Sequence, residues 1–132
     1  MKVLAVNCGS SSIKLNDLRD LLAHERDDAS AAIAVEMFCD RIKKYVGAYL
    51  AALGGAQAVV FTGAIGERSA EVRARVCQGL DGFGLILDPR ANADAAASER
   101  RISAPGSRPE VYVIPTDEEG QIARDTAQAL SR

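Results

Sequence analysis

The first residues whose types suggest chemistry follow a short apolar run, Val3 to Val6. Asn7 is followed by the turn Cys8-Gly9-Ser10-Ser11-Ser12 and then by Lys14. Backbone N–H groups in a tight Gly/Ser turn point outward and bind phosphate oxygens, serine hydroxyls add donors, and a lysine supplies a point charge. The neutral side-chain oxygen of Asn7 suits a magnesium-bound water. An ordinary serine-rich β-turn explains the same composition, so the turn alone leaves both interpretations open.

A second candidate comes where a buried strand of residues 58–62 is expected to end. The loop Gly63-Ala64-Ile65-Gly66-Glu67-Arg68 follows that strand, and Ser69 is placed to cap the next helix. Glycines let the backbone approach a ligand, and a helix start favours an anion or the ribose and phosphate edge of a nucleotide. The loop is neither a P-loop nor a GxGxxG motif, and a simple strand-to-helix turn is the alternative.

A third candidate, Asp117-Glu118-Glu119, opens the last expected helix. Thr116 and Glu119 have the spacing of a capping box, which leaves Glu118 available to a metal ion. Magnesium in phosphoryl transfer takes one or two protein carboxylates and keeps several waters, and Glu118 together with Asn7 fits that pattern. Acidic residues in a first turn also simply complement the helix dipole.

The other reactive side chains give weaker signals. His24, the only histidine, lies beside Glu25 in a charged stretch and is expected to be solvated rather than a general base. Cys8 has no histidine near it in the sequence and receives no nucleophilic role. We expect the remaining arginine charges to form solvated faces; these are Arg68, Arg73, Arg75, Arg100 and Arg101.

The elements that must position these residues alternate between strands and helices. Strands are expected at residues 3–6, 58–62 and 111–114, with a short one at 102–103. Residues 13–15 open a returning strand that does not extend, because the following residues 18–22 read as helical. Strand–glycine loop–helix order is typical of nucleotide-binding α/β folds.

Helices are predicted from capping residues and apolar spacing. A long helix begins after Asp27, with Asp28 or Ser30 as its cap, and ends at Gly54-Gly55. A shorter helix follows Ser69, and residues 91–99 form a surface segment that is helical or mobile. The long helix has an apolar face of Val35, Phe38, Ile42, Tyr45, Tyr49 and Leu53. The face of the shorter helix is Val72, Val76 and Leu80, and that of the last helix is Ile122, Thr126 and Leu130.

Composition bounds the class of protein. The chain has 132 residues, 48% of them hydrophobic with 23 alanines, and a net charge of -2, which favours one domain with a core of small side chains. The acidic balance argues against nucleic-acid binding. No apolar run reaches the roughly 20 residues that span a bilayer, and the start is too short for a secretory signal. Three widely spaced cysteines indicate a reducing, cytoplasmic setting.

Taken together, these segments resemble acetate kinases, in the short-chain carboxylate kinase group. The segment VLAVNCGSSSIK, Val3 to Lys14, looks like the N-terminal signature of that family, and residues 17 to 126 look like its C-terminal part. The matching motifs of the second part are Asp17-Leu18-Arg19-Asp20, Ala34 to Phe38, Phe61 to Glu67, Leu87-Asp88, Ile102-Ser103, and Val113 to Glu119 with Ile122-Ala123.

The resemblance implies a fold, a reaction and a site. The fold is an α/β one of the actin/hexokinase/Hsp70 (ribonuclease H-like) type, and the reaction is ATP plus acetate giving acetyl phosphate and ADP with Mg2+ or Mn2+. Asn7 and Glu118 would bind the metal, with Glu119 as the alternative that the capping spacing disfavours, and Lys14 would contact the nucleotide phosphates. Asp17, Leu18 and Arg19 would lie near the nucleotide, and Gly63, Ala64, Ile65, Gly66 and Glu67 would line its adenosine end. Family members are expected to be cytoplasmic homodimers.

The chain departs from the family chiefly in length. Residues 1–16 correspond to the N-terminal strand and phosphate-binding turn, and residues 17–132 to the C-terminal nucleotide-binding region, joined near Leu15-Asn16. The middle of the family, with the acetate pocket, the catalytic aspartate and the histidines and arginines around the transferring phosphoryl group, is missing. We therefore expect an internally deleted partial domain that is inactive alone. The alternatives are a non-catalytic nucleotide-binding module, a non-functional fragment, and, within the family, a propionate or butyrate kinase.

Overall fold

The computed structural model describes residues 1–8, 15–95 and 98–130 of the chain. In order, its elements are β1 (Val3–Asn7), α1 (Leu15–His24), α2 (Ala29–Leu53), β2 (Ala58–Thr62), α3 (Gly63–Arg68), α4 (Ala70–Cys77), the 3-10 helix η1 (Asp81–Phe83), α5 (Pro89–Ala93), β3 (Arg100–Arg101), β4 (Glu110–Val113) and α6 (Glu118–Leu130). None of the helices in these ranges is long and apolar enough to cross a membrane.

The strands form one mixed sheet in the order β1-β2-β4-β3. β1 pairs in parallel with β2, with Val3 opposite Ala58 and Asn7 opposite Thr62, and β2 pairs in parallel with β4. β3 runs antiparallel to β4. Because the three parallel strands point the same way, their carboxyl ends meet at one edge of the sheet. The predicted α/β class and its three main strands are confirmed.

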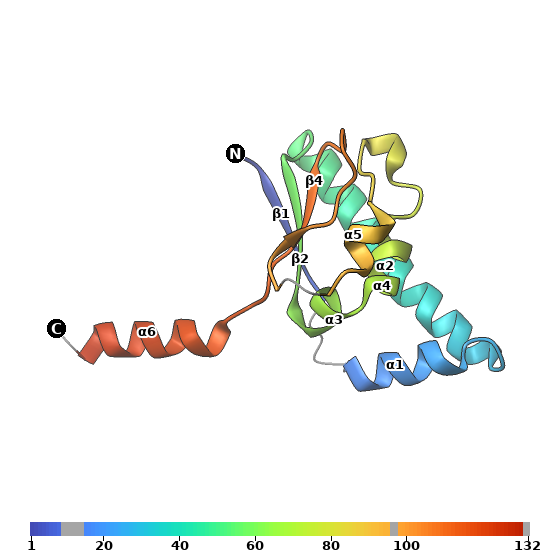
Figure 1. The fold of residues 1–132 in the computed structure, drawn as a ribbon, viewed down its shortest axis with the longest axis horizontal. Helices are drawn as coiled ribbons and strands as arrows, with labels where there is room; N and C mark the ends of the chain where they lie inside the picture. The colour runs from blue at the N-terminus through green and yellow to red at the C-terminus, as the bar shows by residue number, and fades with distance from the viewer. Residues whose placement is uncertain (9–14, 96–97, 131–132) are drawn as a thin grey trace.

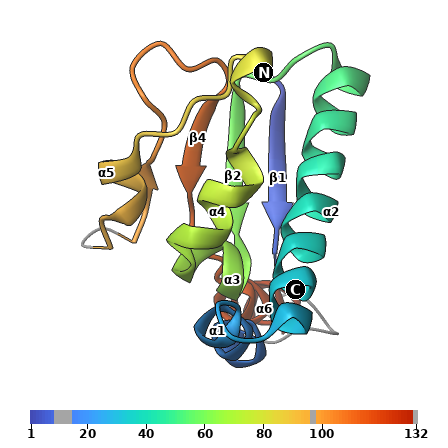
Figure 2. The same ribbon diagram turned by 90° about the vertical axis from the view of Figure 1, so that its right-hand side faces the viewer.

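The helices α2, α4 and α5 lie on one side of this sheet (Figures 1 and 2). The strand residues Val59, Phe61, Val111 and Val113 point toward them and are almost fully buried. On the opposite side, where Val3 is 44% exposed, none of the described elements covers the strands. The core therefore lies between a single layer of helices and one face of the sheet.

Local capping signals set the ends of α2 as expected. The Asp28 carboxylate accepts hydrogen bonds from the backbone N–H groups of Ser30, at 2.8 Å, and Ala31, at 3.4 Å. At the other end Gly54 takes the left-handed conformation, with φ 64°, and closes the helix.

The expected apolar face of α2 is wrong in part. The buried residues are Ala31, Val35, Cys39, Val46 and Leu50, whereas Tyr45 is 60% and Tyr49 53% exposed. Small side chains let the helix pack closely, so its face rotates toward alanine and cysteine. The tyrosines stack on each other beside it, with ring centroids 6.5 Å apart, and keep their hydroxyls at the surface.

Three smaller expectations change. Residues 63–68, expected as a loop, form the short helix α3, because its first N–H group gains a carboxylate partner from the side chain of Glu67. The strand expected at 102–103 lies at Arg100–Arg101, with a single bridge between Leu87 and Ser103. The returning strand at 13–15 falls mostly outside the described residues, and Leu15 already begins α1.

Candidate functional site

Three segments that carry predicted site residues meet at the carboxyl edge of the parallel strands. Asn7 lies opposite Thr62 in register, and the N–H of Cys8 donates to the Thr62 carbonyl at 3.1 Å. The N–H of Ile114 donates to the Phe61 carbonyl at 3.0 Å, so the chain leaving β4 starts beside the end of β2. In open α/β sheets, ligands bind outside the carboxyl ends of the strands. The topology thus gathers Asn7, the segment 63–67 and the segment 114–118 at such an edge.

The Glu67 side chain ties two of these segments together. Its Oε1 atom accepts hydrogen bonds from the N–H of Gly63 at 3.0 Å, the N–H of Thr116 at 2.9 Å and the Thr116 hydroxyl at 3.2 Å. One carboxylate oxygen therefore closes the start of α3 and holds the linker that leads to α6. The sequence motif suggested a ligand-lining role for Glu67 and gave no sign of this connection, because Thr116 lies 49 residues away.

The capping box expected at Thr116 and Glu119 is wrong. The helix begins at Glu118, and its N-cap is Asp117, whose Oδ1 accepts from the N–H of Gly120 at 3.1 Å. Thr116 lies two residues before the first helical residue, with its hydroxyl donating to Glu67, so the capping position falls to Asp117. A side chain at position 120 would press against the Asp117 carboxylate, which gives the glycine there a structural reason.

The expected capping box, which favoured Glu118 as the metal ligand, is therefore absent at Thr116 and Glu119 and no longer supports that assignment. The side chains of Glu118 and Glu119 lie outside the described part of the chain, as does Lys14. Within the described part, no group of three or more histidine, cysteine, aspartate or glutamate side chains is arranged to hold a metal ion. Asn7 is exposed at the end of β1, and an amide oxygen with one carboxylate is a donor pair that Mg2+ accepts alongside water.

Arg73, expected on a solvated face, is instead 1% exposed. Its guanidinium donates to the carbonyls of Gly66 at 2.7 Å and Glu67 at 2.9 Å, and to Asn92 Oδ1 at 2.8 Å and Asn92 O at 2.9 Å. Burial, together with the nearby charge of Arg100, lowers the pKa of Arg73 from its ordinary value to about 10. The sequence analysis missed Arg73. Its position next to Val72 and three residues before Val76 is the signal that could have placed it on the buried face of α4.

Among the other arginines, Arg68 is exposed as expected, whereas Arg75 is paired. Its guanidinium forms ion pairs with Glu25 and Glu71, each at 2.7 Å. A hollow of about 310 Å3 lies beside Glu67, and Arg68, Arg73 and Arg100 are among its lining residues. Positive charge is therefore concentrated next to the end of α3, where an anionic ligand would be favoured.

The segment Asp17-Leu18-Arg19 lies in α1, which sits at the carboxyl end of the strands, below α3 in both views (Figures 1 and 2). Asp17 and Arg19 are exposed, but the side chain of Leu18 is fully buried in the core. Leu18 therefore has only its backbone to offer a ligand. His24 is exposed, with Nδ1 2.7 Å from the Asp20 carbonyl oxygen, as expected for a solvated helix residue.

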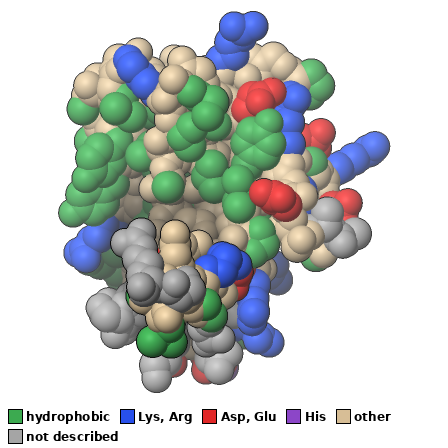
Figure 3. Space-filling model, turned by 90° about the vertical axis from the view of Figure 1, so that its left-hand side faces the viewer, with side chains coloured by type: hydrophobic (Ala, Val, Ile, Leu, Met, Phe, Trp, Pro, Cys, Tyr) green, Lys and Arg blue, Asp and Glu red, His purple; other side chains and the backbone are tan. Residues whose placement is uncertain are grey.

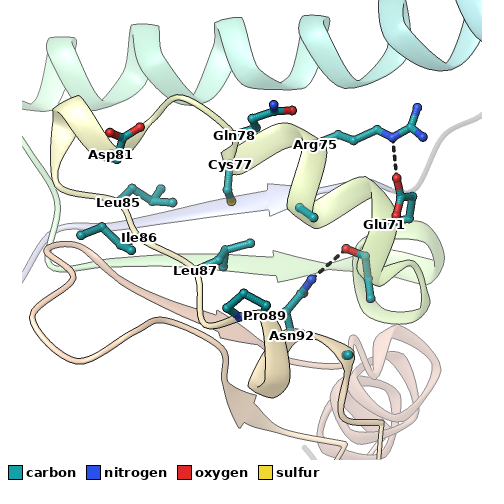
Figure 4. Close-up of a pocket in the computed structure, with 13 residues that line it drawn as sticks. Glu71, Arg75, Cys77, Gln78, Asp81, Leu85, Ile86, Leu87, Pro89 and Asn92 are labelled. Atoms are coloured by element: carbon teal, nitrogen blue, oxygen red, sulfur yellow. Dashed lines mark hydrogen bonds and ion pairs between the residues drawn. The ribbon is translucent and has the colours of Figure 1, made fainter.

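A larger groove, of about 590 Å3, lies on the helical side of the molecule (Figure 4). Leu85, Leu87 and Cys77 supply apolar surface, and the ion pair of Arg75 with Glu71 stands at its rim. None of the predicted site residues lines this groove. The candidate site therefore remains at the carboxyl edge of the sheet.

Comparison with known proteins identifies what this arrangement is similar to. Residues 15–124 match the model of the acetokinase family. The chain is 47% identical over 132 residues to the acetate kinase of Solibacter usitatus (strain Ellin6076), covering 97% of this chain and 32% of that protein. It is 48% identical over 120 residues to the acetate kinase of Chloroherpeton thalassium (strain ATCC 35110 / GB-78), covering 89% of this chain and 29% of that protein.

Solved structures agree with this similarity. The crystal structure of the Porphyromonas gingivalis acetate kinase superposes with a TM-score of 0.78 at 42% identity, over 86% of this chain and 29% of that one. A propionate kinase from Francisella tularensis gives a TM-score of 0.71 at 33% identity, over 82% and 27%. The chain thus spans about a third of the length of the relatives it matches and has the fold of part of them.

Proposed function

Because the chain belongs to the acetokinase family, we propose that it carries the nucleotide- and metal-binding half of an acetate kinase-type phosphotransferase. In the complete reaction, ATP and acetate give acetyl phosphate and ADP. The observation that supports this most is the convergence of Asn7, the segment 63–67 and the segment 114–118 at the carboxyl edge of the parallel strands. That edge is where α/β folds bind nucleotides.

In this proposal the segment Gly63-Ala64-Ile65-Gly66 lines the adenosine end of ATP. Ala64 is exposed whereas Gly63, Ile65 and Gly66 are buried, so in this proposal the ligand meets the segment at Ala64. Asp17 and Arg19 lie near the nucleotide, and Lys14 contacts its phosphates. Glu67 contributes by holding the segment against Thr116, and its Oε1 is engaged in doing so.

Asn7 and Glu118 are the proposed ligands of Mg2+ or Mn2+. A divalent cation at this edge would neutralise the charge of the phosphate oxygens during transfer. Asn7 would hold it through an amide oxygen at the end of β1, and Glu118 through a carboxylate in the first turn of α6. The remaining positions would be filled by water and phosphate oxygens.

We further propose that this chain does not turn over alone. Phosphoryl transfer is accelerated by cations and donors placed around the transferring group and its acceptor. The one histidine of the chain, His24, is exposed and bonded to the backbone of Asp20. The acetate-binding residues of the family have no counterpart among the motifs found here, so the chain would bind nucleotide without an acceptor.

Titration calorimetry with MgATP tests the binding half. We expect saturable heat that is lost in Asn7→Ala and Glu118→Ala and kept in Gln128→Ala, on the polar side of α6. Absence of heat in the parent chain at any nucleotide concentration would contradict the proposal. A hydroxamate assay for acetyl phosphate tests the second half, and enzyme-dependent product from MgATP and acetate would refute the expected inactivity.

A further inference from the structure

The hollow of about 310 Å3 beside the end of α3 carries an excess of positive charge. It is lined by three arginines, Arg68, Arg73 and Arg100. Among the described residues that line it, Glu67 is the one carboxylate. On the open sheet face, by contrast, hydrophobic side chains gather over the strands (Figure 3). The hollow therefore has the charge and the size of a site for a compact anion.

Arg73 supplies a buried charge that no carboxylate of the described residues neutralises. Its side chain is 1% exposed, and its guanidinium donates only to neutral oxygens, the carbonyls of Gly66, Glu67 and Asn92 and the Asn92 amide. Burial and then the charge of Arg100 lower its pKa to about 10, so the guanidinium stays charged at neutral pH. Because a buried charge is normally paired with an opposite one, an anion beside Arg73 would complete this environment.

The carboxylate of Glu67 does not supply this opposite charge. Its Oε1 atom accepts hydrogen bonds from the backbone of Gly63 and from the N–H and hydroxyl of Thr116. Within the described part of the chain, Glu67 forms no ion pair with an arginine. The positive charge of the hollow is therefore left for a ligand.

Arg68, Arg100 and Ser98 bring further donors to the lining. Arg68 is exposed at the end of α3, and it forms no ion pair with any residue that the structure describes. Four of the five N–H donors of Arg73 are engaged by the protein, so Arg73 acts on a ligand mainly through its charge. The forked donors of an arginine bind phosphate oxygens in pairs.

We propose that this hollow binds a free inorganic phosphate dianion, held by Arg68 and Arg100 in the field of the buried Arg73. Three positive charges against one carboxylate favour a doubly charged ligand, and the forked donors favour an oxyanion. The site goes beyond the proposed nucleotide site, because neither Asn7 nor Ala64 lines the hollow. The ligand is therefore a separate anion, bound on the other side of α3 from no shared side chain of the metal pair.

Titration calorimetry with sodium phosphate on the intact chain tests the site, slightly above neutral pH, at constant ionic strength and without magnesium or nucleotide. We expect saturable binding that weakens by roughly 10–100-fold in Arg68→Gln and in Arg100→Gln, because each change removes a charged donor. Arg41→Gln is a matched control, exposed on α2 and outside the lining, and should keep the affinity within about twofold. Circular dichroism checks that each variant is folded.

Three results of this titration would overturn the proposal. The first is a parent chain without saturable heat. The second is an affinity that survives both lining substitutions. The third is an equal loss in Arg41→Gln, because the effect would then come from net charge alone. Arg68 is exposed, so Arg68→Gln decides the question even if Arg100→Gln fails to fold.

A competition experiment separates free phosphate from a phosphate group of the nucleotide. The phosphate titration is repeated with the chain saturated by MgATP, and we expect the same phosphate affinity as without it. Loss of phosphate binding under MgATP would mean that the hollow takes a phosphate group of the nucleotide, and the proposal would be wrong. If the chain binds no MgATP, the proposed function fails, while the titration without nucleotide still decides whether the hollow binds phosphate.

Discussion

Replacing Arg73 by methionine isolates the contribution of the buried guanidinium. Methionine has a similar length and no donors, so the change leaves the carbonyls of Gly66 and Glu67 and both oxygens of Asn92 without their present partner. The same loss loosens the connection between the end of α3 and α5, because Arg73 is the side chain that bonds to both.

The magnitude follows from two opposing effects. Four hydrogen bonds from a charged donor contribute roughly 6–12 kcal/mol together before offsets. Burial, together with the nearby charge of Arg100, lowers the pKa of Arg73 to about 10, which corresponds to a cost of about 3 kcal/mol for the charged form that methionine would recover. The difference is about 3–9 kcal/mol, and we expect a net loss at its lower end, about 3–5 kcal/mol, which is the range seen when one partner of a buried charged network is removed. Against a total stability of about 5–15 kcal/mol, that is a large fraction.

Urea denaturation followed by circular dichroism measures this loss. Arg75→Met is a matched control two residues along α4, where the arginine is half-buried and its ion pairs contribute about 1 kcal/mol or less. Arg73→Lys should fall between the parent and Arg73→Met, because it keeps the charge without the fork of donors. If Arg73→Met is as stable as Arg75→Met, the guanidinium does not hold these segments together and the reasoning fails.

Further predictions concern single groups. Burial raises the pKa of the Cys77 thiol to about 12, so a thiol reagent at neutral pH should modify it only after denaturation, and rapid labelling of the folded chain would contradict its burial. Hydrogen bonding and charge from Arg75 lower the pKa of Glu25. The Glu25–Arg75 pair therefore stabilises the fold above the ordinary glutamate pKa, and this stabilisation is lost as the pH falls through the lowered pKa. Glu25→Gln should make the free energy of unfolding less dependent on pH in this acid range, and an unchanged pH profile would count against the pair. Gly84→Ala should lower stability by roughly 1–3 kcal/mol, because its φ is 80° and a Cβ would lie 2.5 Å from a backbone carbonyl oxygen. Gly82→Ala, in open space at a negative φ, should be near neutral, and equal effects of the two would refute the steric argument.

Local signals in the sequence predicted much of this fold. The caps at Asp28, Gly54 and Ser69 are where the residue types indicate, because each needs only atoms within a few positions along the chain. The parallel strands are likewise marked by short apolar runs. The meeting of Asn7, the segment 63–67 and the segment 114–118 at one sheet edge is a consequence of the parallel direction of β1, β2 and β4, which the structure supplies.

The errors have a common physical origin in contacts between distant residues. Thr116 has the residue type of a cap, but its N–H and its hydroxyl donate to Glu67, 49 positions earlier, and Asp117 caps the helix instead. Arg73 looks like surface charge until the carbonyls of α3 and Asn92, 19 positions on, surround it. In both cases a polar side chain forms hydrogen bonds with residues distant in the sequence. The spacing of apolar residues does not indicate such partners.

The sheet order also governs when the structure can form. Val3 pairs with Ala58 and Ala58 with Glu110, so each parallel pairing joins residues more than fifty positions apart. Closing such long loops is slow, while α2, built from contacts within its own 25 residues, forms quickly. During synthesis β1 therefore emerges first, and about fifty further residues must follow before its partner strand β2 begins. In that interval the uncharged edges of β1 are unpaired and can bind another chain. This topology therefore favours association of the nascent chain with a chaperone or with another nascent chain.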